Sequence, residues 1–468
     1  MPMARTLRFG CAVALLGAAL FGRPVPAAAV TPPVIDPGAL GPAQAASTHP
    51  APQEPTERHS ECARPLLSGP PPTDPPAAQR VLDLPAAWQF SRGAGVKVAV
   101  IDTGVNRNPR LRNLEAGGDF VSDGDGTEDC DGHGTLVAGI IAAQPSPGDA
   151  FVGVAPDADI LTIRQLSLAY QPKNRGGGNP PPGTIDESGY GNVFTLAAAV
   201  VRAVDMGANV INISEVACTA AGGDVADAAL GAAVRYAYDH QVVVVAAAGN
   251  LQPSGGACQN QNDGTGWSTV KTVASPAWFA PYVLSVASVD PDGNPSQFSL
   301  HGPWVNVAAV GRNIYSLDSA PGGAGLVNAI AGADGVQPID GTSFAAPYVS
   351  GLAALVKSRF PNLTAQQVMD RITRTAHGPG AGRDDRIGHG LIDPLAALTA
   401  QLPEQPVSAG ADRPAAFPLP TPPRAPDPRI RSIATIGSIA LVAALGIGLA
   451  VAIPFRRRSG RDQLPDLD

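Results

Sequence analysis

The sequence lacks the features that mark several large functional classes. The net charge is −8 and only 15% of the residues are charged, so no basic stripe is available for nucleic-acid binding. None of the cysteines has CxxC spacing, which argues against a zinc site. The Gly- and Pro-rich stretches 172–191, 251–272 and 318–337 contain no recognisable repeat. We therefore expect a protein that binds no nucleic acid and needs no metal and no cofactor.

The N-terminal residues have the pattern of a secretory signal peptide. Arg5 and Arg8 precede an apolar run from Cys11 to Phe21, and small residues around Ala29 follow. The apolar run is too short and wrongly flanked for a stable membrane span. We expect residues 1–29 to be a signal peptide, with an uncleaved signal anchor as the alternative.

A second long apolar run lies near the C-terminus. Residues Ile433 to Ile453 include no charged side chain, and this length is enough to cross a hydrocarbon core of about 30 Å. Arg456 to Arg458 follow at once, and positive flanks stay on the cytoplasmic side. We expect a transmembrane helix over 431–454, a cytoplasmic tail over 455–468, and the rest of the mature chain on the periplasmic side.

Pro-rich segments separate the central part of the chain from both ends. The composition predicts an N-terminal extension over 30–86, one large domain over 87–401 and a semi-stiff linker over 402–430. The extension is too poor in apolar residues to form a core of its own. We expect it to wrap around the large domain as an arm.

Within the large domain, short apolar runs alternate with helix-compatible stretches. The expected strands are 96–101, 160–163, 210–213, 242–245 and 283–286, and the expected helices are 193–206, 225–240 and 345–359. Near-continuous apolar strands separated by helices predict an α/β fold, in which a parallel sheet is covered on both faces. Functional side chains then collect beyond the carboxyl ends of the strands.

Removal of the signal peptide leaves an even number of cysteines, namely Cys62, Cys130, Cys218 and Cys258. In an exported chain this number predicts two disulfide bonds, and three pairings are open.

Two segments carry residues suited to nucleophilic catalysis. Ser343 lies in G-T-S-F-A-A-P, before a helix-compatible stretch whose N-terminus would favour a negative oxygen. His133 lies in D-G-H-G-T-L-V-A-G, between glycines that leave its imidazole uncovered. Taken alone, Ser343 would more often be a helix N-cap, and His133 a structural or merely exposed residue.

Two further residues supply the groups that such a serine and histidine need. Asp102 follows an apolar strand in V-I-D-T-G, and Asn250 follows another strand in A-A-A-G-N. An acid orients the imidazole, and an amide donor stabilises the oxyanion. Taken alone, each would be an ordinary turn residue, and without a preceding GxGxxG a nucleotide-binding role for Asp102 is weak.

In the order Asp, His, Asn, Ser, these stretches resemble the signatures of the subtilisin-like protease family, the subtilases, from about residue 95 to 393. The resemblance implies a subtilisin-like fold and an acyl-enzyme mechanism. Ser343 would be the nucleophile, His133 the general base, Asp102 the residue that orients the imidazole, and Asn250 the oxyanion donor. The whole plan, together with I-N-I-S-E-V-A-C at 211–218, is similar to that of the mycosins, the proteases of type VII (ESX) secretion systems.

The sequence departs from typical subtilases beside the expected cleft. Ser214, Glu215 and Val216 occupy the positions of a Ser-Leu-Gly stretch that lines the substrate pocket in the family. A Val side chain and an added carboxylate there predict a narrower, more selective cleft, although Val216 also suits plain packing.

The N-terminal arm and an acidic loop raise two further questions. We hypothesise that Cys62 pairs with Cys130 and pins the arm near His133, and that Cys218 pairs with Cys258. The acidic residues Asp123, Asp125 and Asp129 do not have the spacing of an EF-hand, so a solvated loop is expected rather than a calcium site.

These observations predict a serine endopeptidase, anchored by one helix, that processes a secreted protein substrate of a type VII secretion membrane complex. The alternative is a structural or stabilising subunit of that complex with dispensable protease activity. An esterase or lipase is excluded because Ser343 does not lie in a G-x-S-x-G elbow.

Overall fold

The computed structural model describes residues 30–174, 182–185, 189–252, 258–332, 335–380, 382–402, 438 and 440–448. The chain divides into two units, residues 1–401 and 402–468. The expected signal peptide and nearly all of the expected linker lie outside the described residues. In the second unit, residues 440–448 are helical, and no described helix is long and apolar enough to cross a membrane.

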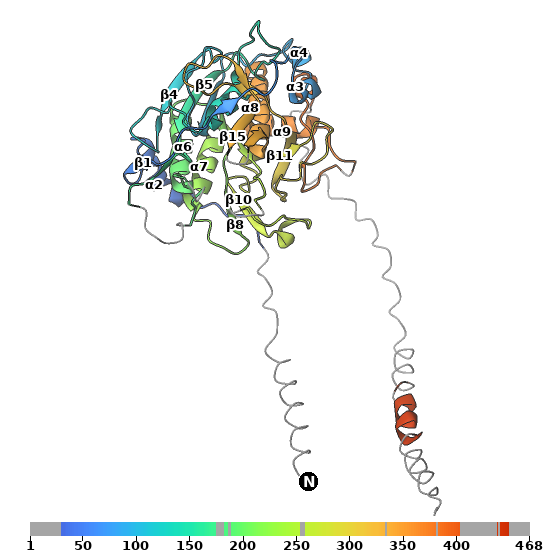
Figure 1. Ribbon diagram of the computed structural model, residues 1–468. Helices are drawn as coiled ribbons and strands as arrows, with labels where there is room; N and C mark the ends of the chain where they lie inside the picture. The colour runs from blue at the N-terminus through green and yellow to red at the C-terminus, as the bar shows by residue number, and fades with distance from the viewer. Residues whose placement is uncertain are drawn as a thin grey trace, which may run out of the picture. The chain divides into compact units, whose positions relative to one another are not determined.

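A parallel sheet forms the centre of the first unit (Figure 1). Its strands are β3 (Lys97–Asp102), β4 (Leu114–Asp119), β5 (Asp159–Arg164), β7 (Val210–Ile213), β9 (Val243–Ala247), β11 (Val283–Val289) and β12 (Val305–Val310). They are ordered β12-β11-β9-β7-β3-β5-β4, and each neighbouring pair is parallel. The predicted α/β class and parallel sheet are confirmed.

Helices cover both faces of this sheet. They are α5 (His133–Ala142), α6 (Val193–Asp205), α7 (Ala228–Asp239), α8 (Thr342–Arg359), α9 (Ala365–Thr375) and α10 (Pro394–Thr399). Alternate residues of β3 show the division: Val98 and Val100 belong to the hydrophobic cluster that contains α5 and α8, whereas Ala99 and Ile101 belong to the cluster of α6 and α7. A strand buried on both faces has this pattern because successive side chains point to opposite sides.

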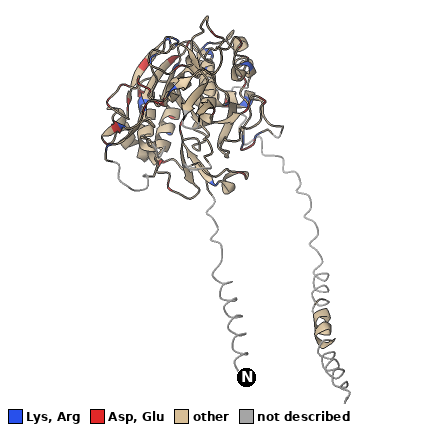
Figure 2. Cartoon of the chain, in the orientation of Figure 1, with Lys and Arg blue, Asp and Glu red and all other residues tan. Residues whose placement is uncertain are grey.

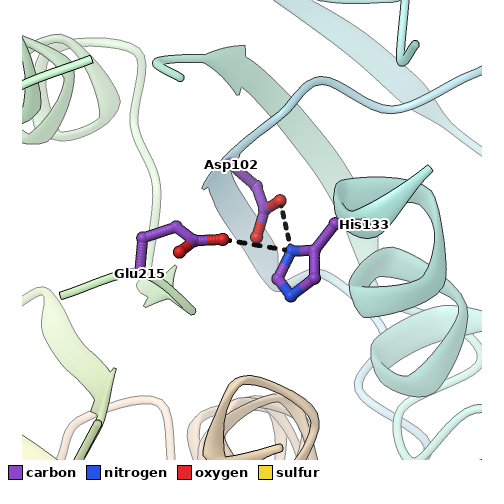
Figure 3. Close-up of side chains that lie close together, drawn as sticks. All are labelled: Asp102, His133 and Glu215. Atoms are coloured by element: carbon purple, nitrogen blue, oxygen red, sulfur yellow. Dashed lines mark hydrogen bonds and ion pairs between the residues drawn. The ribbon is translucent and has the colours of Figure 1, made fainter. Parts of the chain in front are cut away.

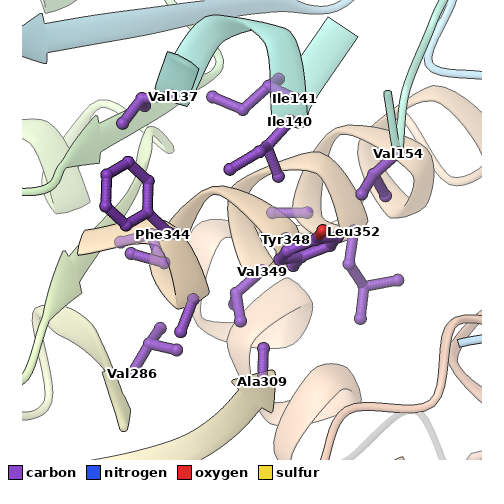
Figure 4. Close-up of a cluster of buried hydrophobic side chains, with 14 of the residues drawn as sticks. Val137, Ile140, Ile141, Val154, Val286, Ala309, Phe344, Tyr348, Val349 and Leu352 are labelled. Atoms are coloured by element: carbon purple, nitrogen blue, oxygen red, sulfur yellow. The ribbon is translucent and has the colours of Figure 1, made fainter. Parts of the chain in front are cut away.

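The packing of α5 against α8 positions the two helices that carry His133 and Ser343. Figure 4 shows Val137, Ile140 and Ile141 of α5 facing Phe344 and Tyr348 of α8. All five side chains are buried, so the two helix starts are held in a fixed relation by close-packed apolar contacts.

Smaller elements complete the first unit. They are α4 (Leu84–Ala87), β6 (Tyr170–Pro172), β8 (Ala217–Ala220), η2 (Trp267–Thr269), β10 (Thr272–Ser275), β13 (Ser316–Leu317), β14 (Leu326–Val327), β15 (Ala329–Gly332) and β16 (Gly335–Pro338). Lys, Arg, Asp and Glu residues are interspersed over this unit in the view of Figure 2.

The N-terminal arm lies along the body of the first unit. Its elements are η1 (Pro37–Ala39), α2 (Leu40–Ser47), β1 (Thr56–Arg58), β2 (Pro65–Leu66) and α3 (Ala77–Val81). Helix α2 packs on α6 and α7, β1 pairs with β6, and β2 pairs with β15. The arm is therefore stabilised by its contacts with the body of the first unit. This is expected of a segment that has too few apolar residues to form its own core.

Candidate active site

The strand order brings the carboxyl ends of β3, β7 and β9 side by side. Ile101 of β3 lies opposite Ile213 of β7, so Asp102, the last residue of β3, is in register with Ser214, the first residue after β7. Asn250 follows β9, the strand on the other side of β7. The candidate residues therefore meet at one edge of the sheet, as expected for a parallel α/β fold.

Asp102 and His133 form the central contact of the site. His133 Nδ1 lies 2.7 Å from Asp102 Oδ1, and the Asp102 side chain is fully buried (Figure 3). The same oxygen accepts hydrogen bonds from the backbone N–H and the hydroxyl of Thr103. Asp102 Oδ2 is buried and has no hydrogen-bond partner among the described residues. This carboxylate fixes the orientation of the imidazole and places a desolvated negative charge beside it.

Helix α5 starts at His133 because the turn before it is anchored from several sides. Asp129 accepts hydrogen bonds from the backbone N–H groups of Gly132 and Thr135, and from the hydroxyls of Thr135 and Thr103. A Cβ on Gly134 would lie 2.0 Å from the carbonyl oxygen of Gly104, so only glycine lets α5 approach the turn after β3 this closely.

Asp129 corrects the expectation of a wholly solvated acidic loop. Asp123 and Asp125 are exposed, as predicted, but Asp129 is 5% exposed and caps the helix that carries the imidazole. Burial raises the pKa of Asp129 to about 7, although its hydrogen bonds to Thr135 and Thr103 act in the opposite direction. Its donors Gly132 and Thr135 follow it in the chain, whereas Thr103 precedes it by 26 positions. The sequence offered one hint, an acid four positions before His133.

Glu215 lies beside the imidazole of His133, whereas the sequence analysis placed it only in the wall of the substrate pocket. Its Oε1 is 3.4 Å from His133 Nδ1, and its side chain is 25% exposed (Figure 3). Burial lowers the pKa of His133, but the negative charges of Asp102 and Glu215 outweigh this effect and raise the pKa to about 10. The two carboxylates therefore favour the protonated form of the imidazole.

Asp102, His133 and Glu215 also present three ligand atoms within 4.8 Å of one another, as a cation site would. His133 Nδ1 already lies at hydrogen-bond distance, 2.7 Å, from Asp102 Oδ1, which implies a proton on Nδ1. A metal ion would have to displace that proton and the bond that orients the ring. We interpret the cluster as a charge arrangement around the imidazole.

Ser343 and Asn250 approach each other beside Gly341. A Cβ on Gly341 would lie 2.9 Å from Ser343 Oγ and 3.4 Å from Asn250 Nδ2, so a side chain at this position would enter the space that the two groups face. Asn250 Oδ1 accepts from the backbone N–H and the hydroxyl of Thr342, and Asn250 Nδ2 is the atom that lies near the Cβ position of Gly341. The arrangement gives an amide donor next to a hydroxyl at a helix start.

The imidazole reaches α8 through Phe344. The ring centroids of His133 and Phe344 are 4.9 Å apart, and Phe344 follows Ser343 directly. Among the described residues, no hydrogen bond joins Ser343 Oγ to His133. Sequence reasoning missed Phe344 and Thr103, which hold the ring and the acid in place, because their roles depend on contacts between separate elements.

Ser214 and Val216 have mainly structural contacts. The Ser214 hydroxyl accepts from Asn212 Nδ2 and donates to the carbonyl oxygen of Ser343 at 2.7 Å. Val216 is half-buried and packs on the core, with Cγ2 3.4 Å from the position of a Cβ on Gly249. The plain-packing alternative for Val216 thus has direct support in its contacts.

The structure joins Cys62 to Cys130 and Cys218 to Cys258, the pairing that we hypothesised. Cys130 lies three residues before His133, and the backbone N–H of Ala63 donates to its carbonyl oxygen. The arm is therefore fastened close to the start of α5.

Comparisons with known proteins agree with this geometry. A sequence profile of the subtilase family (Peptidase S8) matches residues 93–390. The chain is 47% identical to Mycosin-1 of Mycobacterium tuberculosis over 447 residues, which cover 92% of this chain and 96% of the relative.

Solved structures give the same result. The crystal structure of MycP1 from Mycobacterium smegmatis matches with a TM-score of 0.74 at 46% identity and covers 81% of this chain and 97% of that one. A chain in the structure of an intact ESX-5 inner membrane complex matches with a TM-score of 0.72 at 39% identity, covering 90% of this chain and 100% of that one.

Proposed function

This chain is a serine protease of the subtilase family and of its mycosin branch, and we propose that it is a membrane-anchored endopeptidase with Asp102, His133 and Ser343 as its catalytic triad. One observation carries the proposal. The Asp102–His133 pair at 2.7 Å lies at the same sheet edge as the start of α8, where Ser343 and Asn250 face one space.

The proposed reaction is acyl transfer from a peptide bond. Ser343 Oγ attacks the carbonyl carbon while His133 Nε2, which points away from both carboxylates in Figure 3, accepts the hydroxyl proton. Asn250 Nδ2 and the backbone N–H of Ser343 stabilise the oxyanion. His133 then donates the proton to the leaving amine, and water releases the acyl group by the same steps in reverse.

The segment Ser214, Glu215 and Val216 is the proposed wall of the substrate cleft. It follows β7 at the same edge and includes one partly exposed acidic side chain. Val216 packs on the core, so the selectivity proposed for this wall depends on the carboxylate of Glu215.

The location proposed for the protein follows from the sequence at its ends. A signal peptide over 1–29 directs export, and one helix over 431–454 holds the chain in the membrane after a linker over 402–430. The domain over 87–401 then lies on the periplasmic side, with the tail over 455–468 in the cytoplasm. Its partners would be a type VII secretion membrane complex and a secreted protein substrate, a role supported by the likeness to the chain from the ESX-5 inner membrane complex.

The test uses the full-length protein, its secretion system and two variants, Ser343→Ala and His133→Ala. We expect both to lose processing of secreted proteins while they reach wild-type levels in the membrane. Ser358→Ala, a change near the end of the same helix α8, and His240→Ala, an exposed histidine after α7, are the matched controls and should process normally. Normal processing by Ser343→Ala would exclude the proposed nucleophile.

A second candidate function is a structural or stabilising subunit whose protease activity is dispensable. The likeness to the chain within an assembled ESX-5 complex favours it. If Ser343→Ala loses processing but leaves secretion intact, while deletion of residues 433–453 stops secretion, the two functions are separable and both are present.

A further inference from the structure

Glu215 is placed beside the imidazole by the strand order. It lies two residues beyond the end of β7, and β7 is the neighbour of β3, whose last residue is Asp102. Its Oε1 approaches the same ring nitrogen that Asp102 binds, at 3.4 Å against 2.7 Å. Two carboxylates from adjacent strands therefore face one Nδ1–H group (Figure 3).

In the part of the chain that the structure describes, four groups from four elements lie around His133, and none of these four is cationic. Asp102 comes from β3, Glu215 from the segment after β7, Asp129 from the loop before α5, and the Phe344 ring from α8. Asp102 and Asp129 are buried, whereas Glu215 and His133 keep 25% and 21% of their side chains exposed. Glu215 is thus the acid of this set that an incoming group can reach.

The net effect of these charges is to favour protonation of the ring. The negative charges of Asp102 and Glu215 overcome the effect of burial and raise the pKa of His133 to about 10. A protonated imidazole has no lone pair to accept the hydroxyl proton of Ser343. The site therefore needs the ring proton on Nε2 to leave before the first chemical step.

We propose that Glu215 is the specificity-determining residue of the site, which pairs with a Lys or Arg side chain of the substrate and thereby releases the imidazole from its second carboxylate. This inference rests on the triad proposed above. Substrate bound at Ser343 must pass beside the exposed edge of His133. Because Glu215 Oε1 lies 3.4 Å from His133 Nδ1, we infer that a long side chain next to the cleaved bond can reach it.

The chemistry balances without any further component. When a substrate cation pairs with Glu215, one of the two charges that favour imidazolium is neutralised. The pKa of His133 then falls, and a larger share of the molecules releases the Nε2 proton to water. Neutral His133 then accepts the proton of Ser343 Oγ as the bond from Oγ to the carbonyl carbon forms. Basic substrates are therefore both bound and activated by the same contact, whereas neutral ones meet a protonated base.

The experiment compares the full-length wild-type protein with Glu215→Gln and Glu215→Asp. A peptide library read by mass spectrometry reports which residues flank the cleaved bonds, and fluorophosphonate labelling between pH 6 and pH 10 reports the state of the base. We expect wild-type cleavage sites to be enriched in Lys and Arg by about tenfold at one position next to the cleaved bond. Glu215→Gln should lose this enrichment, and Glu215→Asp should retain part of it.

The pH dependence of labelling distinguishes this role of Glu215 from a purely structural one, which would leave the midpoint pH of labelling unchanged. Removal of one negative charge should shift the midpoint of Glu215→Gln labelling down by about one pH unit and speed labelling at neutral pH. An unchanged midpoint and an unchanged cleavage preference in Glu215→Gln would overturn this inference and leave the triad standing. Failure of the wild type to label or cleave at any pH would overturn both.

Discussion

The hydroxyl of Ser214 donates a 2.7 Å hydrogen bond to the carbonyl oxygen of Ser343. In a regular helix this carbonyl would accept from the backbone N–H four residues later, but that residue is Pro347, which has no N–H. The end of β7 thus replaces the hydrogen bond that α8 cannot form. The residue after β7 and the proposed nucleophile are locked together by this contact.

Replacement of Ser214 should therefore disturb the start of α8. Ser214→Ala leaves the buried Ser343 carbonyl without its donor, and we expect a loss of about 1–3 kcal/mol in unfolding free energy together with slower labelling of Ser343. Denaturant unfolding and labelling rates measure the two effects. Ser358→Ala, whose hydroxyl bonds the Ala94 carbonyl at the surface, is the control and should stay within about 0.5 kcal/mol of wild type. Equal stability of both variants would show that the Ser214 contact is dispensable.

Asn250 should act on the reaction more than on the fold. Asn250→Ala removes the Nδ2 donor, and we expect the rate of fluorophosphonate labelling to fall by about 10²–10³. Asn250→Asp keeps an acceptor for Thr342 but has no amide N–H, so it should label equally slowly while it melts closer to wild type. If Asn250→Asp labels at the wild-type rate, the oxyanion role is wrong.

Asp129 should make stability depend on pH. Burial raises its pKa from 3.8 to about 7, so between these values the folded protein holds a proton that the unfolded chain has released. The stability contributed by this proton is present at low pH, falls as pH rises through the window, and stays constant above it. The melting temperature of Asp129→Asn relative to wild type should consequently be lowest near pH 4 and rise toward pH 7. Parallel melting profiles would contradict the burial of this carboxyl.

The Cys62–Cys130 bond should increase the stability of the fold and protect the N-terminal arm from proteolysis. It joins residues 68 positions apart, and its loss in the double Ser variant should cost about 4 kcal/mol in the chain-entropy account. The bond Cys218–Cys258, over 40 positions, gives a control of similar expected cost. Limited proteolysis separates the two: only the first variant should expose the arm over residues 30–76 to cleavage. Equal protection of the arm in both variants would show that β1, β2 and α2 hold it without the bond.

The sequence predicted those strands whose apolar residue pattern matches their burial in the fold. Strands β3, β5, β7, β9 and β11 are mostly apolar and almost entirely buried, and they lie within one or a few residues of their expected bounds. Strand β4 was not expected, because Leu114–Asp119 is a half-exposed edge strand with two glycines and few β-branched residues. Helix α8 starts at Thr342, before the expected residue 345, since the first turn is stabilised by contacts with Asn250 rather than by local propensity.

In the candidate site, too, the sequence predicted the residues that lie in short motifs but not those whose roles depend on contacts between separate elements. Asp102, His133, Asn250 and Ser343 were found because short motifs carry them in order along the chain. The 3.4 Å approach of Glu215 to His133 depends on β7 lying next to β3, and the sequence does not state this strand order. The burial of Asp129 likewise depends on donors from α5 and from Thr103, which only the folded chain brings together.

The most direct test of the proposed triad is to label the full-length protein with a fluorophosphonate in detergent and to locate the adduct by mass spectrometry. We predict one adduct, on Ser343, that appears faster as the pH rises from 7 toward 10 and is absent in His133→Ala. An adduct on a different serine, or labelling of Ser343 that persists without His133, would contradict the assignment of these residues as nucleophile and base.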